Sequence, residues 1–375
     1  MRKTEATRRL GIAHPLVQGP FGGGISTARL AATVAGRGGL GSYGAHVLDP
    51  DGILAIARDI RALTSGAFAL NLWVADQDPG GLDFDAAELA RVARLFAPYF
   101  AELGVPMPPP PEPRQVGHRF VDQVQAVLEA RPPVFSFVFG VPPADVLRAC
   151  RERDIVTVGA ATSIAEARAL DDAGVDVIVA TGFEAGGHRP SFLARAEDSL
   201  MGTFALTQLV SDRVKAPVVA AGGIVDGRGV RAALALGAQA AQLGTAFLAC
   251  EESAASPEHR AALFGERAAS TTLTRSFSGR LARGMRNRWT REMAGHDADF
   301  AAYPLQSYFT GQLKQAARGL ADHSVSVAAR TELVSLWAGQ AAPNLRHRTA
   351  AALMDALVRD TDEPTTSHAS KEDIE

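Results

Sequence analysis

Short apolar runs alternate with amphipathic helical patterns along the first 250 residues. The runs carry almost no polar positions, which is typical of strands that are buried on both faces of a parallel sheet. Between them, apolar residues recur at helical spacing, as Ile53, Ile56 and Ile60 do within residues 50–63. Eight runs read as strands, at residues 16–19, 40–43, 68–74, 134–139, 155–159, 175–180, 217–221 and 240–248.

Eight strands in alternation with helices favour a closed (β/α)₈ barrel, the TIM-barrel fold, of class α/β. An open, doubly wound sheet is the alternative. However, no GxGxxG follows the first strand with an acidic residue about twenty positions later. We therefore predict that residues 1–74 and 134–250 form a (β/α)₈ barrel that binds a cofactor.

The regular pattern breaks in two places. Residues 75–133 carry acidic and Pro-rich pieces around two helical stretches, and they are far longer than an ordinary barrel connection. They are predicted to form a helical, Pro-rich insertion after the third strand. Beyond residue 250 the strand pattern stops, so residues 251–359 are predicted to form a mostly helical C-terminal segment that completes the substrate-binding part. The polar residues 360–375 are predicted to be a disordered tail.

Composition narrows the class of function. The net charge is -3 at pH 7, with arginines and carboxylates interspersed, which indicates neither a nucleic-acid partner nor a membrane partner. The charged N-terminal residues lack the apolar core of a secretory signal, so we expect a cytoplasmic protein. Cys150 and Cys250 match no zinc spacing, and no metal site is predicted.

Candidate chemistry centres on residues 182–190, GFEAGGHRP, which follow the sixth strand. His188 can exchange a proton near neutral pH, while Gly186 and Gly187 let the backbone approach a flat ligand. A lone histidine in a loop is more often solvated or structural than catalytic. Its place at the carboxyl end of a barrel strand, where the active sites of this fold lie, favours catalysis.

Two glycine-containing segments coincide with the ends of the seventh and eighth strands, where such barrels commonly bind phosphate. One contains Gly222 and Gly223, and the other contains Gln242, Gly244 and Thr245. Backbone N–H groups of unhindered glycines can bind a phosphate dianion. These glycines could also serve only as tight turns, but their presence in two consecutive loops favours a phosphate site.

A phosphate anchor beside apolar strand ends suits FMN. The amide of Asn71 lies in a predicted buried strand and needs hydrogen-bond partners, which a flavin ring could supply. Asn71 could equally be a satisfied amide of the core. The loop after the first strand could lie against one face of the ring, through Gly19, Pro20, Phe21 and Gly22.

Six motifs, in register along the chain, resemble the nitronate monooxygenase family, formerly called 2-nitropropane dioxygenase. They are QGPFGGG at residues 18–24, NLWV at 71–74, SFVFG at 136–140, GFEAGGHR at 182–189, AAGGI at 220–224 and QLGT at 242–245. The resemblance continues weakly through residues 279–289 and 335–340. Each motif alone is loose, but six in order are specific.

The resemblance implies an FMN-dependent barrel enzyme that oxidises alkyl nitronates, such as propionate 3-nitronate or related nitroalkanes. It would use O₂ and give a carbonyl product with nitrite or nitrate. By similarity, Asn71, Gly223 and residues 242–245 would contact FMN, Gly186 or Gly187 would face the flavin, and His188 would be the active-site histidine. As imidazole, this histidine could take an α-proton from a nitroalkane; as imidazolium, it could hold an anionic nitronate.

Three residues depart from the pattern of the family. Phe21 stands where many members have methionine, Thr181 where a glutamine that reaches the flavin is expected, and Pro190 where glycine is common. Thr181 therefore counts among the predicted cofactor contacts with an altered side chain. These departures bear on the flavin contacts and the substrate specificity more than on the fold.

Two other functions fit the same motifs. An FMN-dependent NAD(P)H reductase of the enoyl-acyl-carrier-protein or quinone type would share the barrel, flavin and phosphate loops, although the insertion at residues 75–133 fits the monooxygenase better. A non-catalytic phosphate- or nucleotide-binding barrel is the second alternative. A homodimer is compatible with the sequence, but no heptad seam supports a particular oligomeric state.

Overall fold

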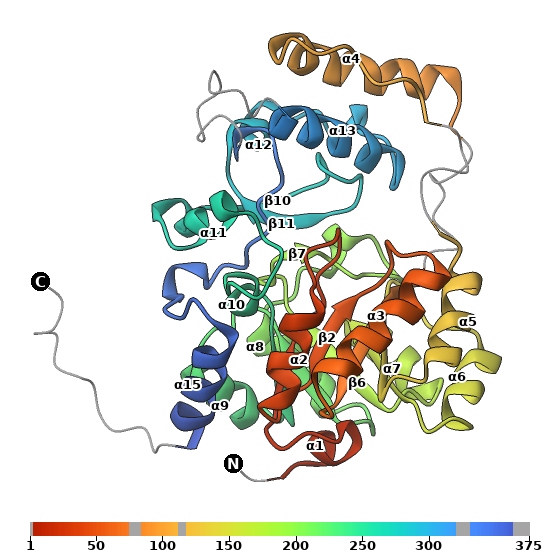
Figure 1. Ribbon diagram of the computed structural model, residues 1–375, viewed down its shortest axis with the longest axis vertical. Coiled ribbons are helices and arrows are strands. Elements are labelled where there is room, and N and C mark those ends of the chain that lie inside the picture. Colours follow the sequence, from red (N-terminus) through yellow and green to blue (C-terminus); the bar gives the residue numbers. More distant parts are fainter. Residues whose placement is uncertain (1–2, 75–83, 112–117, 320–330, 363–375) are drawn as a thin grey trace, which may run out of the picture.

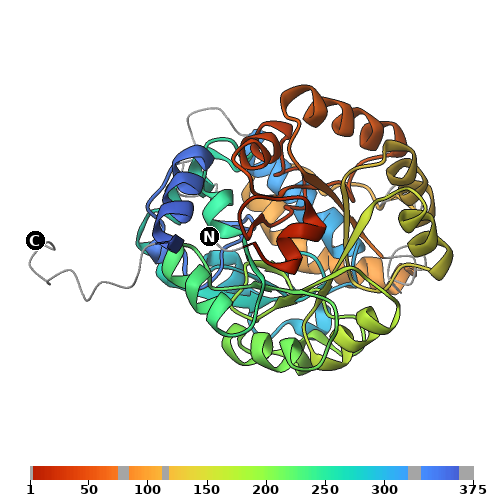
Figure 2. The ribbon, with the colours of Figure 1, turned by 90° about the horizontal axis from the view of Figure 1, so that it is seen from below.

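Eight parallel strands form the centre of the protein, and helices surround them (Figures 1 and 2). The computed structural model describes residues 3–74, 84–111, 118–319 and 331–362. Parts of the predicted insertion, and all of the predicted tail after residue 362, lie outside this range. The strands are β1 (Leu16–Gln18), β2 (Gly41–Gly44), β3 (Phe68–Trp73), β4 (Val134–Val138), β5 (Val156–Ala161), β6 (Val177–Thr181), β8 (Val218–Ala221) and β9 (Ala240–Leu243).

The sheet closes into a barrel. Its order is β1-β9-β8-β6-β5-β4-β3-β2, and a parallel bridge between Val17 and Leu40 joins the two ends. At this seam the Gln18 N–H donates to the carbonyl of Leu40, and the Leu40 N–H donates to the carbonyl of Leu16, both at 2.9 Å. The predicted (β/α)₈ barrel is confirmed.

Helices that follow the strands cover the outside of the barrel. They are α2 (Ala28–Gly36), α3 (Pro50–Leu63), α5 (Phe120–Ala130), α6 (Ala144–Arg151), α7 (Ile164–Asp172), α8 (Thr203–Ser211) and α9 (Gly227–Ala235), and α15 (Ala350–Asp362) packs between α2 and α9. Helix starts follow local chemistry: the side chain of Thr27 caps α2 and that of Asp49 caps α3, each by accepting a backbone N–H.

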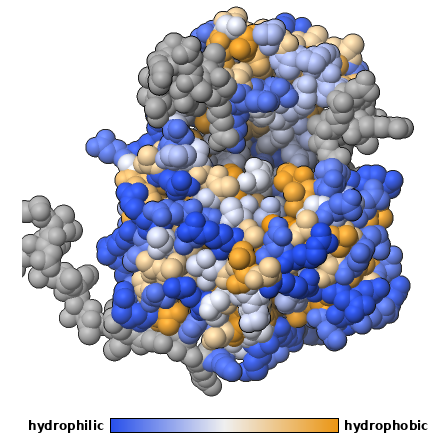
Figure 3. Space-filling view, viewed as in Figure 1, coloured by the Kyte–Doolittle hydropathy of each residue, from blue (hydrophilic) through white to orange (hydrophobic). Residues whose placement is uncertain are grey.

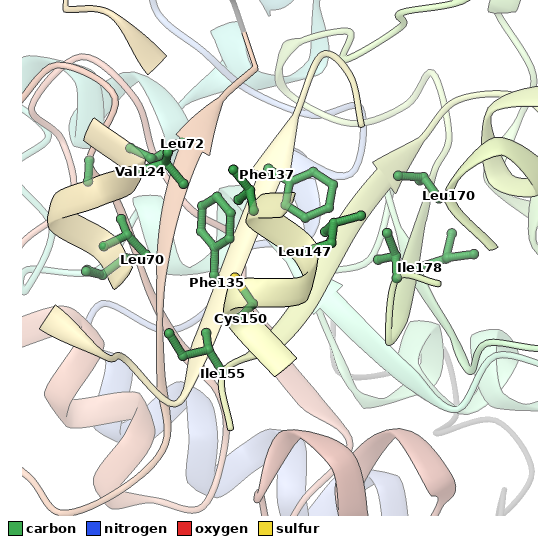
Figure 4. Close-up of a cluster of buried hydrophobic side chains, with 14 of the residues drawn as sticks. Leu70, Leu72, Val124, Phe135, Phe137, Leu147, Cys150, Ile155, Leu170 and Ile178 are labelled. Carbon is green, nitrogen blue, oxygen red and sulfur yellow. The ribbon is translucent and has the colours of Figure 1, made fainter. Parts of the chain in front are cut away.

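Neighbouring residues of each strand face two different cores. In β4, Phe135 packs outward among helix side chains such as Leu147 (Figure 4). Its neighbour Val134 belongs to the cluster inside the barrel. Because successive side chains point to opposite faces and both faces are buried, the strands read as continuous apolar runs. Helix α1 (Glu5–Leu10) lies across the lower end of the barrel, where Leu10 joins the inner cluster (Figure 2).

A second layer lies above the carboxyl ends of the strands. We call it the cap; it comprises α4 (Ala86–Glu102) and residues 271–319 (Figure 1). Its core contains Phe96 and Tyr99 of α4, Phe277, Trp289 of α12 (Arg288–Glu292) and Leu313 of α13 (Leu305–Gly319). Between barrel and cap runs α10 (Thr245–Leu248), followed by α11 (Pro257–Leu263).

The two helical stretches of the predicted insertion lie in different layers. Helix α4 packs in the cap against α13, whereas α5 packs beside α3 on the barrel. The Gln123 side chain of α5 donates hydrogen bonds to the carbonyls of His46 (2.9 Å) and Leu48 (2.7 Å) at the carboxyl end of β2. Helix α5 is thus one of the barrel helices.

The structure differs from the sequence interpretation at three elements. The last barrel strand ends at Leu243, and the apolar residues expected to prolong it form α10, because a short buried run carries no period that separates strand from helix. Two strands do occur after residue 250, β10 (Thr271–Thr274) and β11 (Ala282–Met285). Helix α15 continues to Asp362, so the first residues of the predicted tail are helical.

Hydrophilic and hydrophobic residues are interspersed on the face of the barrel in Figure 3. Within the described part of the chain, every helix is too short or too polar to cross a bilayer.

Candidate functional site

A cavity of about 550 Å³ lies between the carboxyl ends of the barrel strands and the cap. Its size is within the range of small-molecule and cofactor sites. Every predicted site residue lines it: Gly19, Pro20, Phe21, Gly22, Asn71, Thr181, Gly186, Gly187, His188, Gly222, Gly223, Gln242, Gly244 and Thr245. Five segments that are distant in the sequence therefore meet at one place.

The loop after β6 has little freedom to move. The Glu184 carboxylate accepts hydrogen bonds from the Thr203 N–H (2.9 and 3.0 Å) and from the Thr203 hydroxyl (2.8 Å). A Cβ at Gly182 would lie 1.9 Å from the Thr203 Oγ1, and one at Gly186 would lie 2.6 Å from the carbonyl carbon of Ala338. These two glycines are required because other chain segments touch the loop backbone.

A small antiparallel sheet fixes the position of His188. The residue is part of β7 (Gly187–His188), which pairs with β11 and not with the barrel, although the sequence placed His188 at the end of the sixth strand. The next residue, Arg189, is buried, and its guanidinium donates to the carbonyls of Thr181 (2.7 Å) and Ser199 (2.6 Å). The pairing of β7 with β11 and the hydrogen bonds of Arg189 therefore both fix the position of His188.

The His188 ring lies among aromatic side chains. Its Nε2 is 2.8 Å from the Ser278 hydroxyl oxygen, and its ring centre is 5.2 Å from that of Trp73 and 5.4 Å from that of Trp337. Burial, followed by the charges of Arg280 and His46, lowers the pKa of His188 to about 3. At this pKa the imidazole is neutral at physiological pH, whereas the family resemblance implied that an imidazolium could hold the nitronate.

The partly buried guanidinium of Arg280 supports the aromatic wall. The Arg280 Cζ lies 3.6 Å from the ring centre of Phe139, 4.9 Å from that of Tyr303 and 5.3 Å from that of Trp73. These rings line the cavity, whereas Arg280 lies behind them. Such cation–π contacts hold a positive charge close to the cavity.

The cavity has an electrostatic preference. Among the described residues that line it, none is an aspartate or glutamate, and Lys314 is the one side chain with a permanent charge. A concave surface with cations nearby and without carboxylates favours an anionic ligand. The described residues also contain no group of three or more His, Cys, Asp or Glu that could hold a metal ion.

Several groups are suited to the ring and the phosphate of a flavin nucleotide. Asn71 is 3% exposed and donates to the Ser136 hydroxyl (3.0 Å), but its Oδ1 accepts no hydrogen bond within the described part of the chain. Gly222 and Gly223 have φ angles of 108° and 71°, which residues with a side chain rarely adopt. A Cβ at Gly244 would meet nothing within 4 Å. The spare amide acceptor and the uncovered glycine backbone fit FMN.

Sequence reasoning missed His46, Phe139, Ser278, Tyr303 and Trp337. His46 and Phe139 follow the second and fourth barrel strands, so the rule that active sites lie at the carboxyl ends of strands could have identified them. The other three come from the cap and from residues 331–362, where no strand pattern pointed to the cavity.

Comparisons with known proteins show the family to which the chain is similar. The family model described as nitronate monooxygenase matches residues 3–360. The nitronate monooxygenases of Paraburkholderia phytofirmans and Pseudomonas aeruginosa are both 41% identical over 94% of this chain, covering 93% and 98% of their own lengths.

Solved structures give the same picture. Nitroalkane oxidase from Streptomyces ansochromogenes is 35% identical, with a TM-score of 0.84 over 96% of this chain and 98% of its own. FabK from Thermotoga maritima is 26% identical, with a TM-score of 0.69 over 96% of both chains. With its barrel, its histidine loop and relatives along almost its whole length, the chain belongs to the nitronate monooxygenase family of oxidoreductases.

Proposed function

We propose that the protein oxidises alkyl nitronates with O₂ and bound FMN, giving a carbonyl product and nitrite or nitrate. Propionate 3-nitronate or a related nitroalkane is the proposed substrate. The observation that carries the proposal is the meeting of His188, Asn71 and two glycine loops in one cavity that has no lining carboxylate among its described residues. That combination suits a phosphorylated flavin together with an anionic substrate.

FMN would supply the redox step, and the protein would supply binding and orientation. The Asn71 Oδ1 could accept a hydrogen bond from the flavin ring, and Gln242, Thr181 and residues 19–22 would lie beside it. The backbone at Gly222, Gly223, Gly244 and Thr245 would hold the phosphate. Gly186 and Gly187 would face the flavin next to His188.

A neutral His188 affects whether the substrate is expected to bind as a neutral nitroalkane or as an ionised nitronate. An imidazole with a pKa of about 3 is a weak base, whereas efficient proton abstraction needs a base whose pKa lies near the working pH. The ring can still hydrogen-bond an oxygen of a bound nitronate. This favours substrates that arrive already ionised as nitronates over neutral nitroalkanes.

The proposal is tested with the purified protein. Its absorbance spectrum is expected to show a flavin, which is released as FMN on denaturation. Oxygen uptake is expected to be much faster with propionate 3-nitronate than with 3-nitropropionate, whose nitro group is not ionised. A colourless protein that fails to take up added FMN, or a flavoprotein with no nitronate-dependent oxygen uptake, would contradict it.

A flavin-dependent NAD(P)H reductase is the second candidate, favoured by the similarity to FabK. Anaerobic mixing with NADH or NADPH separates the two functions. Rapid bleaching of the flavin, without nitronate-dependent oxygen uptake, would identify a reductase. A non-catalytic binder instead predicts that His188→Ala leaves any measured turnover unchanged.

The expected homodimer and cytoplasmic location stay predictions. Sedimentation velocity measures the first, and fractionation of the source cells measures the second.

A further inference from the structure

We propose that His46 is a second substrate-binding residue, which donates a hydrogen bond from its Nε2 to an oxygen of the nitronate group held beside His188. The identity of the ligand rests on the proposed function. The donor itself rests on the surroundings of His46 alone.

The His46 ring is fixed in the wall of the cavity. It stacks on Trp73 with ring centres 3.9 Å apart and planes 7° from parallel, and its carbonyl accepts the Gln123 hydrogen bond from α5. A Cβ at Gly22 would lie 2.6 Å from the His46 Cε1, so the glycine leaves room for the ring. Because the ring stacks on Trp73 with one face and meets Gly22 at its Cε1 edge, it is held in one orientation.

The two nitrogens of His46 have different surroundings. Nδ1 is buried and has no hydrogen-bond partner among the described residues. Nε2 also bonds to no described residue, but it is not enclosed, and His46 lines the cavity. Nε2 is therefore the nitrogen that a ligand can reach.

The different surroundings of Nδ1 and Nε2 also indicate which nitrogen of His46 carries the proton. Burial, followed by the charge of Arg280, lowers the pKa of His46 to about 3, so the ring carries one proton at neutral pH. A proton on Nδ1 would be a buried N–H without an acceptor, which proteins rarely tolerate. The Nε2–H tautomer avoids the unpaired N–H and directs its donor at the cavity.

The neighbours of His46 favour a nitronate oxygen as the acceptor. Trp73 stacks on His46 and also meets the His188 ring edge-on at 5.2 Å between ring centres, so both histidines border the same part of the cavity. A nitronate has two oxygens that accept hydrogen bonds and share a negative charge. No lining carboxylate of the described chain competes for the donor.

Two substitutions test the donor. His46→Phe keeps a flat ring against Trp73 but removes the N–H, whereas His46→Gln keeps an N–H donor without the aromatic stack. We expect His46→Phe to raise KM and lower kcat/KM for propionate 3-nitronate about tenfold, the effect of one lost hydrogen bond. His46→Gln should recover part of this loss, and the FMN content should be unchanged in both.

His296→Gln is the matched control. This histidine is exposed, pairs with Asp299 and does not line the cavity, so its substitution should leave KM unchanged. If His46→Phe keeps the wild-type KM, the proposal is overturned. If it loses FMN while its loaded fraction keeps the wild-type KM, the acceptor is the cofactor and the substrate assignment is overturned.

A measurement that does not depend on turnover separates this inference from the proposed function. Nitrogen NMR of the full-length, histidine-labelled protein reports which ring nitrogen carries the proton. We expect the proton of His46 on Nε2, and a change at that nitrogen when 3-nitropropionate is titrated in. A proton on Nδ1 overturns the inference even in an active enzyme. If propionate 3-nitronate is not oxidised, the tautomer and the titration still decide whether His46 donates to an oxygen ligand.

Discussion

Two imidazoles with lowered pKa values line one cavity, which predicts that the protein is sensitive to acid. In the folded chain, the pKa values of His46 and His188 are both lowered from 6.5 to about 3, with burial as the largest cause. Between these values the unfolded chain binds more protons than the folded chain. The free energy of unfolding is therefore at its highest with respect to these groups above pH 6.5, and it decreases as the pH falls towards 3.

The first prediction is a loss of stability in mild acid. Each histidine contributes a slope of at most about 1.4 kcal/mol per pH unit, and contact with the open cavity keeps the slope below this ceiling. Melting temperatures measured from pH 7.5 to 4.5 should fall more steeply for the wild type than for His46→Phe. Parallel curves for the two proteins would show that His46 is not held neutral by the fold.

The second prediction concerns the glycine at the start of α10. A Cβ at Gly244 points into open space, and its φ of -97° suits any residue, so Gly244→Val should fold normally while its side chain occupies the cavity. We expect at least a tenfold weaker FMN affinity, measured by flavin titration of the protein stripped of its cofactor.

Gly104→Ala is the control for Gly244→Val. Its Cβ also meets nothing within 4 Å, but it lies outside the cavity and at a φ of 67°, so it should affect stability and not FMN binding. If Gly244→Val keeps the wild-type FMN affinity, the assignment of phosphate binding to this loop is wrong.

Single site residues could be predicted where they follow a barrel strand, because the active sites of this fold lie at the carboxyl ends of the strands. The glycine loops and His188 follow barrel strands, and the structure brings them to the same cavity. The charge of His188 was not predictable, because its pKa depends on burial and on Arg280, which lies 92 positions along the chain. The sequence shows an imidazole, whereas its ionisation is set by tertiary packing.

At the scale of elements, the sheet of β7, β10 and β11 could not be predicted from the sequence. Strand β7 has two residues, and its partner β11 lies about a hundred positions further on. Strand β10 reads TTLT and is half-buried throughout, so it shows neither an apolar run nor alternation. Pairing of this kind is decided by the tertiary fold and leaves no local signal.

The third prediction concerns the cap. Trp289 of α12 is fully buried, packs against Tyr99 (4.8 Å between ring centres) and Phe96 (5.0 Å) of α4, and donates from its indole N–H to the Ser276 hydroxyl (3.1 Å). Trp289→Ala should lower the free energy of unfolding by about 3–5 kcal/mol in urea titrations. Leu63→Ala, at a position that is 60% exposed, should cost less than about 0.5 kcal/mol.

A smaller effect of Trp289→Ala would mean that the cap unfolds separately from the barrel. In that case the urea transition should divide into two steps, because the two layers would no longer melt together.

At the scale of the whole molecule, the cavity joins the two layers. Its lining runs from Gly19 after the first barrel strand to Ala341, beyond the cap. The strand pattern was sufficient for the barrel, because eight apolar runs in alternation with helices admit few folds. The position of the cap over the barrel was not readable, because it depends on aromatic contacts between segments about 190 residues apart, such as Phe96 and Trp289.

The fourth prediction follows from this joint lining. FMN that binds the folded chain and not the unfolded one should stabilise the protein by about 2.7 kcal/mol at a free concentration of a hundred times Kd. Thermal unfolding of cofactor-free protein with increasing FMN measures it. Riboflavin, which lacks the phosphate, should stabilise less, and equal shifts for the two would contradict a phosphate site.

Trp73, on which His46 stacks, lines the cavity, so its fluorescence should report whether a flavin is bound. The chain has three tryptophans; Trp73 and Trp337 line the cavity, while Trp289 is buried in the core of the cap. A bound flavin absorbs where indoles emit, so loading the cavity should quench the two lining tryptophans more strongly than the third. The intrinsic fluorescence of the unlabelled protein should therefore follow cofactor binding, and a Trp289→Phe variant would leave only the two lining tryptophans emitting.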